Sequence, residues 1–443
     1  MDLFYIIRRT ADFIWGPQML LFILGSGLYF SIALKFIQFR QFGNAVRAFG
    51  RSTQSTGEGN ISPYQALMAA LSGIVGNGNI AGVATAIVMG GPGAIFWMWA
   101  SALILMATMY SEALLGFHFR GKMKDGTYIG GPMVYIQNGL GWRSLSVAFA
   151  IAMAVKTLIA TTSIQSNSMA IGLNNQFGIP VYQSCIVIAL LTWIVVIGGL
   201  KRIAETAQIL VPFMSLVYLG CGVLILLLNY NQLIPAFEEI FRHAFTTKGA
   251  VGGFAGASVM MALRYGAARG AYSNEAGTGS VAILHATAKT DNAVYQSLIA
   301  MLGVFIDTII VCTITALVLL VSGLWTSDLN STALTSESFG IGLGGANWIV
   351  IFSSLLFGYS TLITWCFYGE QCAGYLLGDR IKVLYRWLFC ASIMLGAAGT
   401  AESIWSLGDV LNGITVIINL IGIIALSPVV IRVTLGNGEQ RRS

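Results

Sequence analysis

The stretch SGIVGNGN, residues 72–79, places three glycines and two asparagines inside a long apolar run. A helix surrounded by lipid has no water to satisfy exposed backbone groups, so glycines and amides are costly at its centre. Gly73, Gly76 and Gly78 allow the backbone to leave helical geometry. A helix that breaks here exposes N–H groups, which attract a carboxylate, and carbonyl oxygens, which attract a cation. The stretch therefore favours a binding site for an amino acid and a cation near the middle of a membrane.

Small residues also allow two membrane helices to pack closely, which is the alternative interpretation of this stretch. Packing does not require amides, however, and Asn77 and Asn79 would each cost several kcal/mol if they stayed unsatisfied in lipid. We therefore expect a substrate carboxylate near Gly76, Asn77 and Gly78, with Asn79 helping to hold the site together.

The composition assigns the whole chain to the membrane. Of its 443 residues, 56% are hydrophobic and 9% are charged, whereas soluble domains have about 25% charged residues. Windows of about 20 apolar residues predict an all-α integral membrane protein with about eleven transmembrane helices in one domain, 1–443. The first helix follows Arg8 and Arg9, and we expect it to be retained rather than cleaved. The helices are expected near residues 12–36, 63–90, 93–117, 146–172, 180–199, 203–229, 249–267, 294–322, 345–371, 384–403 and 410–431.

The positive charges of the loops predict the orientation. With the N-terminus outside, most loop lysines and arginines fall on the cytoplasmic side, and only Arg8, Arg9, Arg242 and Lys248 fall outside. Because such a bias marks the cytoplasmic side of membrane proteins, we expect an external N-terminus and a cytoplasmic C-terminus. The same distribution explains the net charge of +6 without a nucleic-acid partner.

Two blocks carry a resemblance to a known family. SGIVGNGNIAGVATAIVMGGPGAIFWMW (72–99), followed by ALRYGAARGAYSNEAGTGS (262–280), resembles the alanine or glycine:cation symporter family, whose members pair these blocks in this order. The similarity continues through QSNS (165–168), DTIIVCTITALVL (307–319) and STLITWCFYGEQ (360–371). The resemblance implies a leucine-transporter-type fold in the plasma (inner) membrane of a prokaryote.

That fold has one leading helix before two inverted five-helix repeats with broken helices 2 and 7. Here the leading helix and connector would be 1–61, the first repeat 62–230 and the second repeat 249–432. Five helices form an odd-numbered unit, so two such units in tandem must lie in opposite orientations, which places their interface near the midplane.

The repeat pattern also predicts a break in helix 7, the counterpart of helix 2. The glycines of GAVGGFAGAS (249–258) would supply it, with Phe254 as a candidate substrate-binding residue. The next segment, 264–290, carries charges such as Arg264, Arg269 and Glu275, and we expect it to be a cytoplasmic loop with a short helix. Close packing of the glycines is the alternative for helix 7.

The resemblance implies further substrate-binding residues, Gln165 in helix 4 and Thr361 and Trp365 in helix 9. Thr361 and Trp365 are four residues apart and share one helix face. An indole there would close the pocket over a small side chain. Tryptophan in membrane proteins is also an interfacial anchor, but Trp365 lies well inside helix 9.

The resemblance implies a sodium site as well. The break motif of the fold, G-x-x-V-G-x-G-N, is similar to residues 72–79, with a serine in place of the first glycine. Sodium would bind carbonyl oxygens of Ser72 and Val75 and hydroxyl groups of Ser360 and Thr361. Adjacent hydroxyl groups within a helix also bond to the preceding turn, which is the alternative. Sodium is expected as the co-transported ion, with no organic cofactor.

Charged residues inside the membrane are expected to find partners. On one hypothesis Lys156 in helix 4 pairs with Asp307 in helix 8; on another, Asp307 meets Arg264. Glu112, at the inner end of helix 3, is expected to form a cytoplasmic ion pair. The six cysteines are expected to be reduced packing residues.

These features predict a secondary active symporter that imports small neutral amino acids, alanine or glycine, with sodium by alternating access. The alternative is a proton-coupled carrier, or one of broader specificity that takes serine or glutamine. A channel would show repeated pore-lining segments or charged rings, and an enzyme would show clustered titratable groups, so neither is favoured and no catalytic residue is expected. The expected partners are a small neutral amino acid and the lipid bilayer, without nucleic acid, and a monomer is one option left open.

Overall fold

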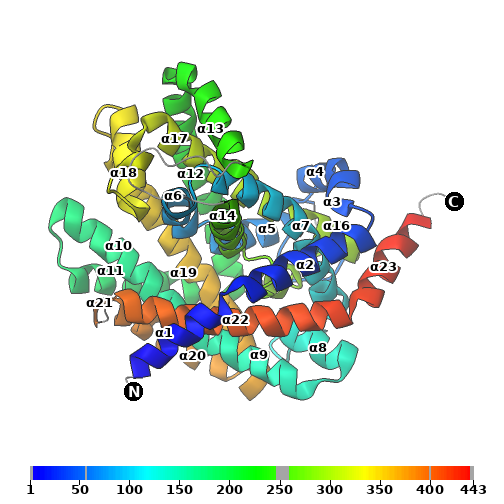
Figure 1. Cartoon of the computed structure of the whole chain (residues 1–443). Helices are drawn as coiled ribbons and strands as arrows, with labels where there is room; N and C mark the ends of the chain where they lie inside the picture. The colour runs from blue at the N-terminus through cyan, green and yellow to red at the C-terminus, as the bar shows by residue number, and fades with distance from the viewer. Residues whose placement is uncertain (1–2, 55–56, 246–258, 399–400, 440–443) are drawn as a thin grey trace.

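The computed structural model describes residues 3–54, 57–245, 259–398 and 401–439, which fold into packed helices (Figure 1). The described sheet is a small hairpin of β1 (Gly121–Lys122) and β2 (Tyr128–Ile129). The helices up to residue 245 are α1 (Leu3–Ile14), α2 (Pro17–Ala33), α3 (Ile37–Arg40), α4 (Phe42–Gly50), α5 (Pro63–Ile74), η1 (Gly78–Gly82), α6 (Val83–Gly90), α7 (Ala94–His118), α8 (Pro132–Leu140), α9 (Arg143–Lys156), η2 (Thr157–Thr161), α10 (Thr162–Phe177), α11 (Val181–Val196), α12 (Gly199–Leu228), η3 (Tyr230–Gln232) and α13 (Leu233–Phe245). The later helices are α14 (Val259–Asn274), α15 (Ser280–His285), α16 (Ala293–Val304), η4 (Phe305–Cys312), α17 (Thr313–Ser322), η5 (Leu324–Thr326), α18 (Ser331–Gly342), α19 (Trp348–Leu377), α20 (Ile381–Ser392), α21 (Leu395–Ala398), α22 (Ala401–Ala425) and α23 (Ser427–Glu439).

Every predicted membrane position holds at least part of a helix, but not every helix is long enough to cross a bilayer. α11 has 16 residues and α20 has 12, which correspond to about 24 and 18 Å at 1.5 Å per residue. The bent pair Pro63–Ile74 and Gly78–Gly90 brings the number of possible spans in the described residues to 8. The other spans are Tyr5–Ala33, Ala94–His118, Arg143–Phe177, Gly199–Leu228, Ala293–Ser322, Trp348–Leu377 and Ser406–Ala425.

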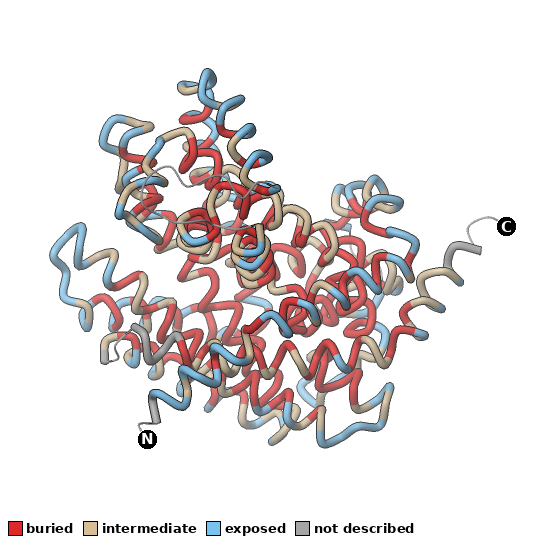
Figure 2. The backbone as a smooth tube through the Cα atoms, viewed as in Figure 1, coloured by how far each residue is buried: buried red, intermediate tan, exposed pale blue. Residues whose placement is uncertain are grey.

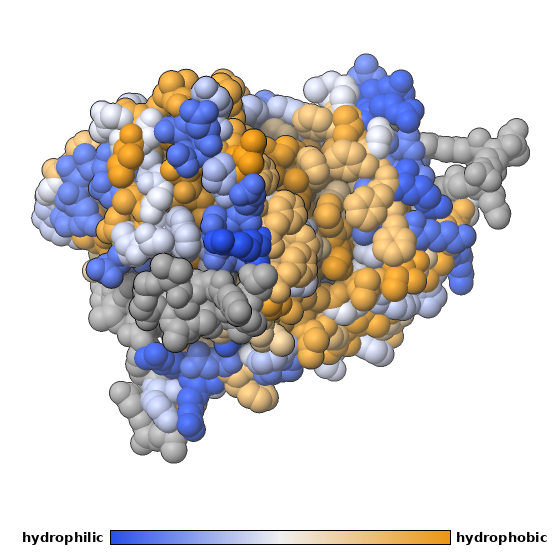
Figure 3. Space-filling view, turned by 45° about the horizontal axis from the view of Figure 1, so that its top comes forward, coloured by the Kyte–Doolittle hydropathy of each residue, from blue (hydrophilic) through white to orange (hydrophobic). Residues whose placement is uncertain are grey.

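The outer surface of these helices is apolar, as contact with lipid requires. Leu21, Leu190, Leu216 and Leu227 each expose 59% or more of their surface. Figure 3 shows hydrophobic residues over the middle of one face and hydrophilic residues gathered toward its ends. Figure 2 shows buried residues along the central helices. The protein therefore presents apolar side chains outward as well as inward, which distinguishes a membrane protein from a soluble one.

The first predicted break is confirmed. α5 begins with a capping box, in which Ser62 Oγ accepts from the Gln65 N–H and Gln65 Oε1 accepts from the Ser62 N–H, while Pro63 needs no N–H at this position. The helix ends at Ile74, Val75 is extended, and the chain resumes as the π-helical turn η1 before α6. The two halves are bent by 53°.

The structure shows a second break at a place that the sequence did not predict. GAVGGFAGAS and Phe254 lie outside the described residues. Most of the segment 264–290 forms the helices α14 and α15, rather than a loop with one short helix. The break lies between them, at 275–279, where Glu275, Gly277 and Gly279 have φ values of 59°, 96° and 77°.

The packing of α14 explains why a segment that carries arginines forms a buried helix rather than the predicted loop. One face of α14 consists of small buried residues, including Ala262, Gly266 and Gly270, and it packs along α7. A Cβ atom on Gly266 would lie 2.1 Å from the Ala94 carbonyl oxygen, so this close approach requires glycine. Arg264 is exposed away from that face. A helix can therefore carry arginines and still be buried along one side.

Two further long helices contain π-helical stretches beside the breaks. η2 interrupts the span made of α9 and α10, and η4 interrupts the span made of α16 and α17. η4 contacts η1, and η2 contacts both α19 and α22. Such π-helical turns are frequent at functional sites, and here η4 lies against the π-helical turn that follows the first break.

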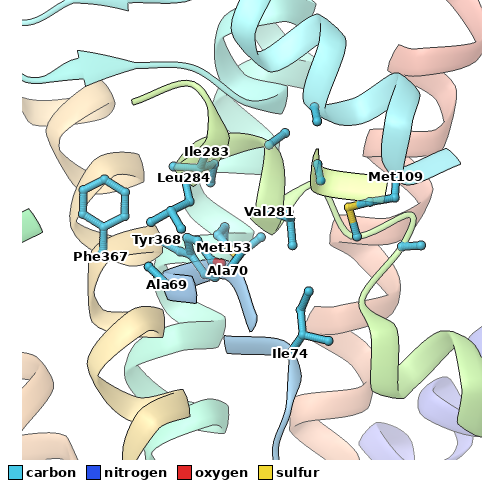
Figure 4. Close-up of a cluster of buried hydrophobic side chains, with 14 of the residues drawn as sticks. Ala69, Ala70, Ile74, Met109, Met153, Val281, Ile283, Leu284, Phe367 and Tyr368 are labelled. Carbon is cyan, nitrogen blue, oxygen red and sulfur yellow. The ribbon is translucent and has the colours of Figure 1, made fainter. Parts of the chain in front are cut away.

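An apolar cluster packs beside the breaks (Figure 4). It joins α5, α7, α9, α15 and α19, and its members are almost completely shielded from solvent. The cluster fixes the half-helices α5 and α15 against their neighbours, so the backbone groups between them are held in place by packing. The residues labelled in Figure 4 are Ala69, Ala70, Ile74, Met109, Met153, Val281, Ile283, Leu284, Phe367 and Tyr368.

The six cysteines are all free, as expected, and five of them are buried.

Candidate functional site

A cavity of about 60 Å³ lies between the two breaks. Residues of both breaks and of η2, α10, α19 and α22 line it. The predicted substrate-binding residues in its wall are Gly76, Asn77, Gly78, Gln165, Thr361 and Trp365. The other lining residues are Gly73, Ile74, Lys156, Ala160, Thr161, Ile164, Tyr272, Ser273, Glu275, Gly408 and Asn412.

Asn79 does not line this cavity. It contacts the backbone of the first break at Gly76. Its Oδ1 accepts a hydrogen bond from the Gly76 N–H (2.9 Å), and its Nδ2 donates to Asp307 Oδ1 (2.6 Å). The side chain is fully buried. Asn79 therefore ties the first break to η4 and leaves the cavity wall to Asn77 and Gly78.

Asn77 and Gln165 form one polar side of the cavity. Asn77 Nδ2 donates to Gln165 Oε1 at 3.1 Å, and Asn77 Oδ1 accepts from Ser354 Oγ at 2.6 Å. These bonds link the first break to α10 and to α19. The amides are thus oriented by each other and by a hydroxyl group, which a packing role for the glycines alone would not require.

Trp365 is a cavity wall and not an interfacial anchor, because only 3% of its surface is exposed. Its indole Nε1 donates to the Gly73 carbonyl oxygen at 3.2 Å. Lys156 Nζ lies 4.2 Å from the centroid of the ring. One turn earlier, the Thr361 hydroxyl group lies close to the first break, 3.1 Å from where a Cβ atom of Gly76 would be. Thr361 and Trp365 therefore face the broken helix together.

The residues predicted to bind sodium meet where α5 ends against α19. Ser360 Oγ lies 3.1 Å from the Ser72 carbonyl oxygen, and Ser72 Oγ donates to the Ser360 carbonyl oxygen at 2.7 Å. The hydroxyl groups of Ser360 and Thr361 also lie 2.9 Å from the Phe357 carbonyl oxygen, so the bond to the preceding turn is present. Val75 follows the last residue of α5. A hydroxyl group that donates to a carbonyl keeps its oxygen lone pairs, so these oxygens can still bind a cation.

The partner predicted for Lys156 is wrong. Lys156 Nζ donates to Asn412 Oδ1 of α22 at 2.7 Å. The acid with which Lys156 interacts electrostatically is Glu275 in the second break. Glu275 itself accepts a hydrogen bond from Ser280 Oγ at 2.9 Å. The pair Lys156 and Glu275 spans the cavity from the C-terminal end of α9 to the second break.

Both predictions for Asp307 are wrong as well. Asp307 forms no ion pair with Lys156 or Arg264 in the described structure. Instead, Asn79 donates to Oδ1, while Ser273 Oγ (3.0 Å) and Thr308 Oγ1 (2.8 Å) donate to Oδ2. Neutral donors from both broken helices satisfy this carboxylate, so a distant arginine is not needed.

Glu112 does not form a cytoplasmic ion pair. It is fully buried, and its Oε1 accepts from the Gly277 N–H at 2.7 Å and from Asn419 Nδ2 at 2.6 Å. The sequence position near the end of helix 3 suggested an exposed charge. In the structure, Gly277 of the second break and Asn419 of α22 cover the Glu112 carboxyl group instead.

The side of the cavity formed by Tyr272, Ser273 and Glu275 was not identified from the sequence. The signal was present in YSNEAGTGS, where two glycines and several polar residues follow an apolar segment as they do at 72–79. The charges of α14 concealed it. Among the described residues no group of three or more histidine, cysteine, aspartate or glutamate side chains could hold a metal ion.

Comparison with known proteins agrees with this arrangement. The profile of the sodium:alanine symporter family matches residues 2–443. The sodium/alanine symporter AgcS of Methanococcus maripaludis is 40% identical over 100% of this chain and 99% of that relative. A probable sodium/glutamine symporter of Bacillus subtilis, GlnT, is 35% identical over 96% of this chain and 89% of that relative.

Solved structures share the fold at low sequence identity. MhsT in complex with L-phenylalanine has a TM-score of 0.60 and 10% identity, over 83% of this chain and 89% of that one. A Na⁺-coupled sialic acid symporter has a TM-score of 0.53 and 14% identity, over 88% and 82%. The fold is therefore the leucine-transporter type. The match along its whole length shows that this chain belongs to the sodium:alanine symporter family, whose members are transporters and not enzymes.

Proposed function

We propose that this chain is a secondary active symporter that imports alanine, glycine or another small neutral amino acid with sodium by alternating access. The observation that supports this most is the cavity between two helix breaks, with Gly76 and Gly78 on one side and Ser273 on the other. Family membership supports sodium as the coupling ion. Relatives named as alanine and glutamine symporters support an amino acid as the cargo.

The two breaks offer opposite charges to a zwitterion. No described residue accepts a hydrogen bond from the N–H groups of Asn77 and Gly78, which stand at the start of η1 and α6. We assign the substrate carboxylate to these groups, because a helix N-terminus attracts an anion. The substrate ammonium then faces the C-terminal end of α14, near Tyr272 and Ser273, where free carbonyl oxygens attract a cation.

The apolar part of the cavity suits a small side chain. Trp365, Ile74, Ala160 and Ile164 supply it. Trp365 is fixed by its bond to Gly73, so the wall cannot retreat without losing a hydrogen bond. We infer that alanine and glycine fit this space, and that leucine or phenylalanine would have to displace packed side chains at a cost of roughly 1–3 kcal/mol. Gln165 and Thr361 complete the pocket, and Phe254 stays a candidate contact outside the described residues.

Asn79 acts in this proposal as a positioning residue. Its bond to the Gly76 N–H removes one donor from the break and leaves the next two for the carboxylate. Asp307 in turn orients the Asn79 amide.

We further propose that sodium binds the carbonyl oxygens of Ser72 and Val75 and the hydroxyl groups of Ser360 and Thr361. The ion would join the C-terminal end of α5 to α19. Because the Thr361 hydroxyl group is also close to Gly76 in the substrate cavity, one side chain belongs to both sites. This shared position gives a physical route by which sodium and amino acid affect each other's binding.

The orientation and the repeats complete the proposal. We infer an external N-terminus and a cytoplasmic C-terminus from the loop charges. Residues 1–61 form the leading helix and connector, and 62–230 and 249–432 form the two inverted repeats.

Uptake into proteoliposomes tests this function. An inward sodium gradient with a membrane potential of about 100 mV supplies about 2.3 kcal/mol per charge, enough for roughly fifty-fold accumulation. Radiolabelled alanine should therefore accumulate in sodium and not in choline at the same pH, with protein-free liposomes as the control. Equal uptake in sodium and in choline would contradict the proposal.

A further inference from the structure

The second break is clamped between α7 and α22. The Gly277 N–H donates to Glu112 Oε1 at 2.7 Å, and Asn419 Nδ2 donates to the same oxygen at 2.6 Å and to the Gly277 carbonyl oxygen at 2.9 Å. The Tyr135 hydroxyl group donates to Asn419 Oδ1. Both backbone polar groups of Gly277 are therefore held by two side chains, and Glu112 contributes only one of its oxygens.

The other oxygen of Glu112 has no partner. Oε2 is buried without a hydrogen bond, although the Gly279 amide faces the carboxylate. No lysine, arginine or histidine of the described chain lies within ion-pair distance of Glu112. The titratable groups that face it are Glu275 from the break and Tyr135 from α8. One of these is a second acid, so the surroundings offer no compensating charge.

Two other buried carboxylates show how much more support an ionised group receives in this protein. Glu370 is held by Arg386, with Nε at 2.5 Å from Oε2 and Nη2 at 3.1 Å from Oε1. Both oxygens of Asp307 accept hydrogen bonds. An ionised carboxylate without a cation and with one bare oxygen is far costlier to bury, and such groups become neutral instead.

We propose that Glu112 is a proton-binding site, where a neutral carboxylic acid holds the second break in this conformation and loses its proton when the break moves away. In that step the O–H bond at Oε2 breaks, the carboxylate forms, and the proton passes to water that reaches the site in the other conformation. Alternating access supplies the movement, so the link to transport rests on the proposed function. The bound proton then favours the present conformation over the other.

Alanine binding as a function of pH tests this site. In saturating sodium, the affinity of the wild type should change between mildly acidic and mildly alkaline pH, by up to about tenfold per pH unit because one proton is linked to the conformation. Glu112→Gln keeps an acceptor for Gly277 and cannot ionise, so its affinity should not depend on pH. Glu205→Gln, at an exposed position of α12, should keep the wild-type profile. An unchanged pH slope in Glu112→Gln, or a flat profile in the wild type, would overturn the proposal.

An infrared measurement decides the question without substrate and without a mutant of Glu112. In wild-type protein with ¹³C-labelled glutamate, the carbonyl stretch of a neutral carboxylic acid should be present at mildly acidic pH, where an ordinary glutamate is already ionised, and it should be present equally in Glu275→Gln. Absence of that band at this pH in the wild type, or its absence in Glu275→Gln alone, would overturn the assignment to Glu112. If alanine fails to bind at all, the proposed function fails while this band still reports on the proton.

Discussion

The two helix breaks face one cavity, yet they are held by different chemistry. In the first break, neutral side-chain amides hold the chain in place. Asn79 is bonded to the Gly76 N–H, and Asn77 is bonded to Gln165. In the second break the buried acid Glu112 holds Gly277. The backbone of the second break is also left-handed at several positions, whereas the first break has no such residue. A neutral break suits the binding of a charged substrate group, while an acid-held break can respond to protons.

The partners of the two breaks also differ in their distance along the chain. In the first break the Gly76 N–H bonds to Asn79, three residues along the chain, although Asn77 of the same break bonds to Gln165, 88 residues away. Glu112 is 165 residues from Gly277, and Asn419 is 142 residues from it. The second break therefore depends on tertiary structure, and substitutions in the two breaks should differ in their effect on stability.

The largest effect is expected from Trp365→Ala, which removes the wall shared by the first break and Lys156. Loss of a buried aromatic ring costs about 3–5 kcal/mol, and here it also leaves the Gly73 carbonyl without its donor. Alanine affinity should fall more than tenfold, and leucine should gain access. Trp365→Phe keeps a ring without the N–H and should lose less. Competition with labelled alanine measures both, and a variant that binds alanine normally and still excludes leucine would show that the pocket lies elsewhere.

The next effect contrasts glycines from the two breaks. Gly279 has φ of 77°, and a Cβ atom there would lie 2.2 Å from Pro132 Cγ. Gly279→Ala should therefore cost about 2–5 kcal/mol from strain and overpacking together. At Gly78 the nearest atom would be Ser273 Cα at 3.7 Å, so Gly78→Ala should change the melting temperature little. Equal melting temperatures for the two variants in detergent would remove the distinction between the breaks.

A smaller effect is expected for the amides of the first break. Asn79→Ala leaves the Gly76 N–H without a partner and leaves Asp307 Oδ1 with only the longer bond from Ser273 Oγ at 3.2 Å, which should weaken alanine binding by about 1–3 kcal/mol. Gln165→Ala should cost about 1 kcal/mol, because Gln165 is only partly buried and water can replace it. Calorimetric titration with alanine distinguishes the two. If both variants bind alanine with unchanged affinity, Asn79 and Gln165 contribute only to packing and not to the binding site.

The smallest effect is expected at a site remote from both breaks. Burial alone would raise the pKa of Asp125, but hydrogen bonds from Lys382 and Thr127 outweigh it and lower the pKa. Because the native pKa is lowered, this contribution to stability is present above the pKa of the unfolded chain and is lost as the pH falls through the native value. Asp125→Asn should therefore cost less than about 1 kcal/mol at neutral pH, since the side chain is partly exposed, and nothing at strongly acidic pH. Melting curves at two pH values check this, and a larger cost at acidic pH would contradict it.

The parts of the fold that the sequence predicted are those whose signals are local. Ser62 and Pro63 mark the start of α5, and 72–79 marks its break within an apolar run. Trp365 was placed in the pocket by its position within helix 9 and by resemblance. Residues 275–279 carry similar glycines, but the arginines of α14 concealed a helix whose buried face consists of small residues.

The partners of the buried charged residues could not be predicted from the sequence. Lys156 meets Asn412 and Glu275, and Asp307 meets neutral donors, because helices remote in sequence converge on one cavity. Hydropathy places a charge inside a membrane but does not say which helix faces it. Only the packing of the chain supplies that information.

The most direct test of sodium-coupled amino-acid binding between the breaks is the affinity of the purified protein for alanine at several sodium concentrations. Because Thr361 belongs to both proposed sites, the dissociation constant for alanine should fall as sodium rises, and alanine should tighten sodium binding by the same factor. Choline should have neither effect. An affinity for alanine that is the same in sodium and in choline would contradict a shared site and the coupling that depends on it.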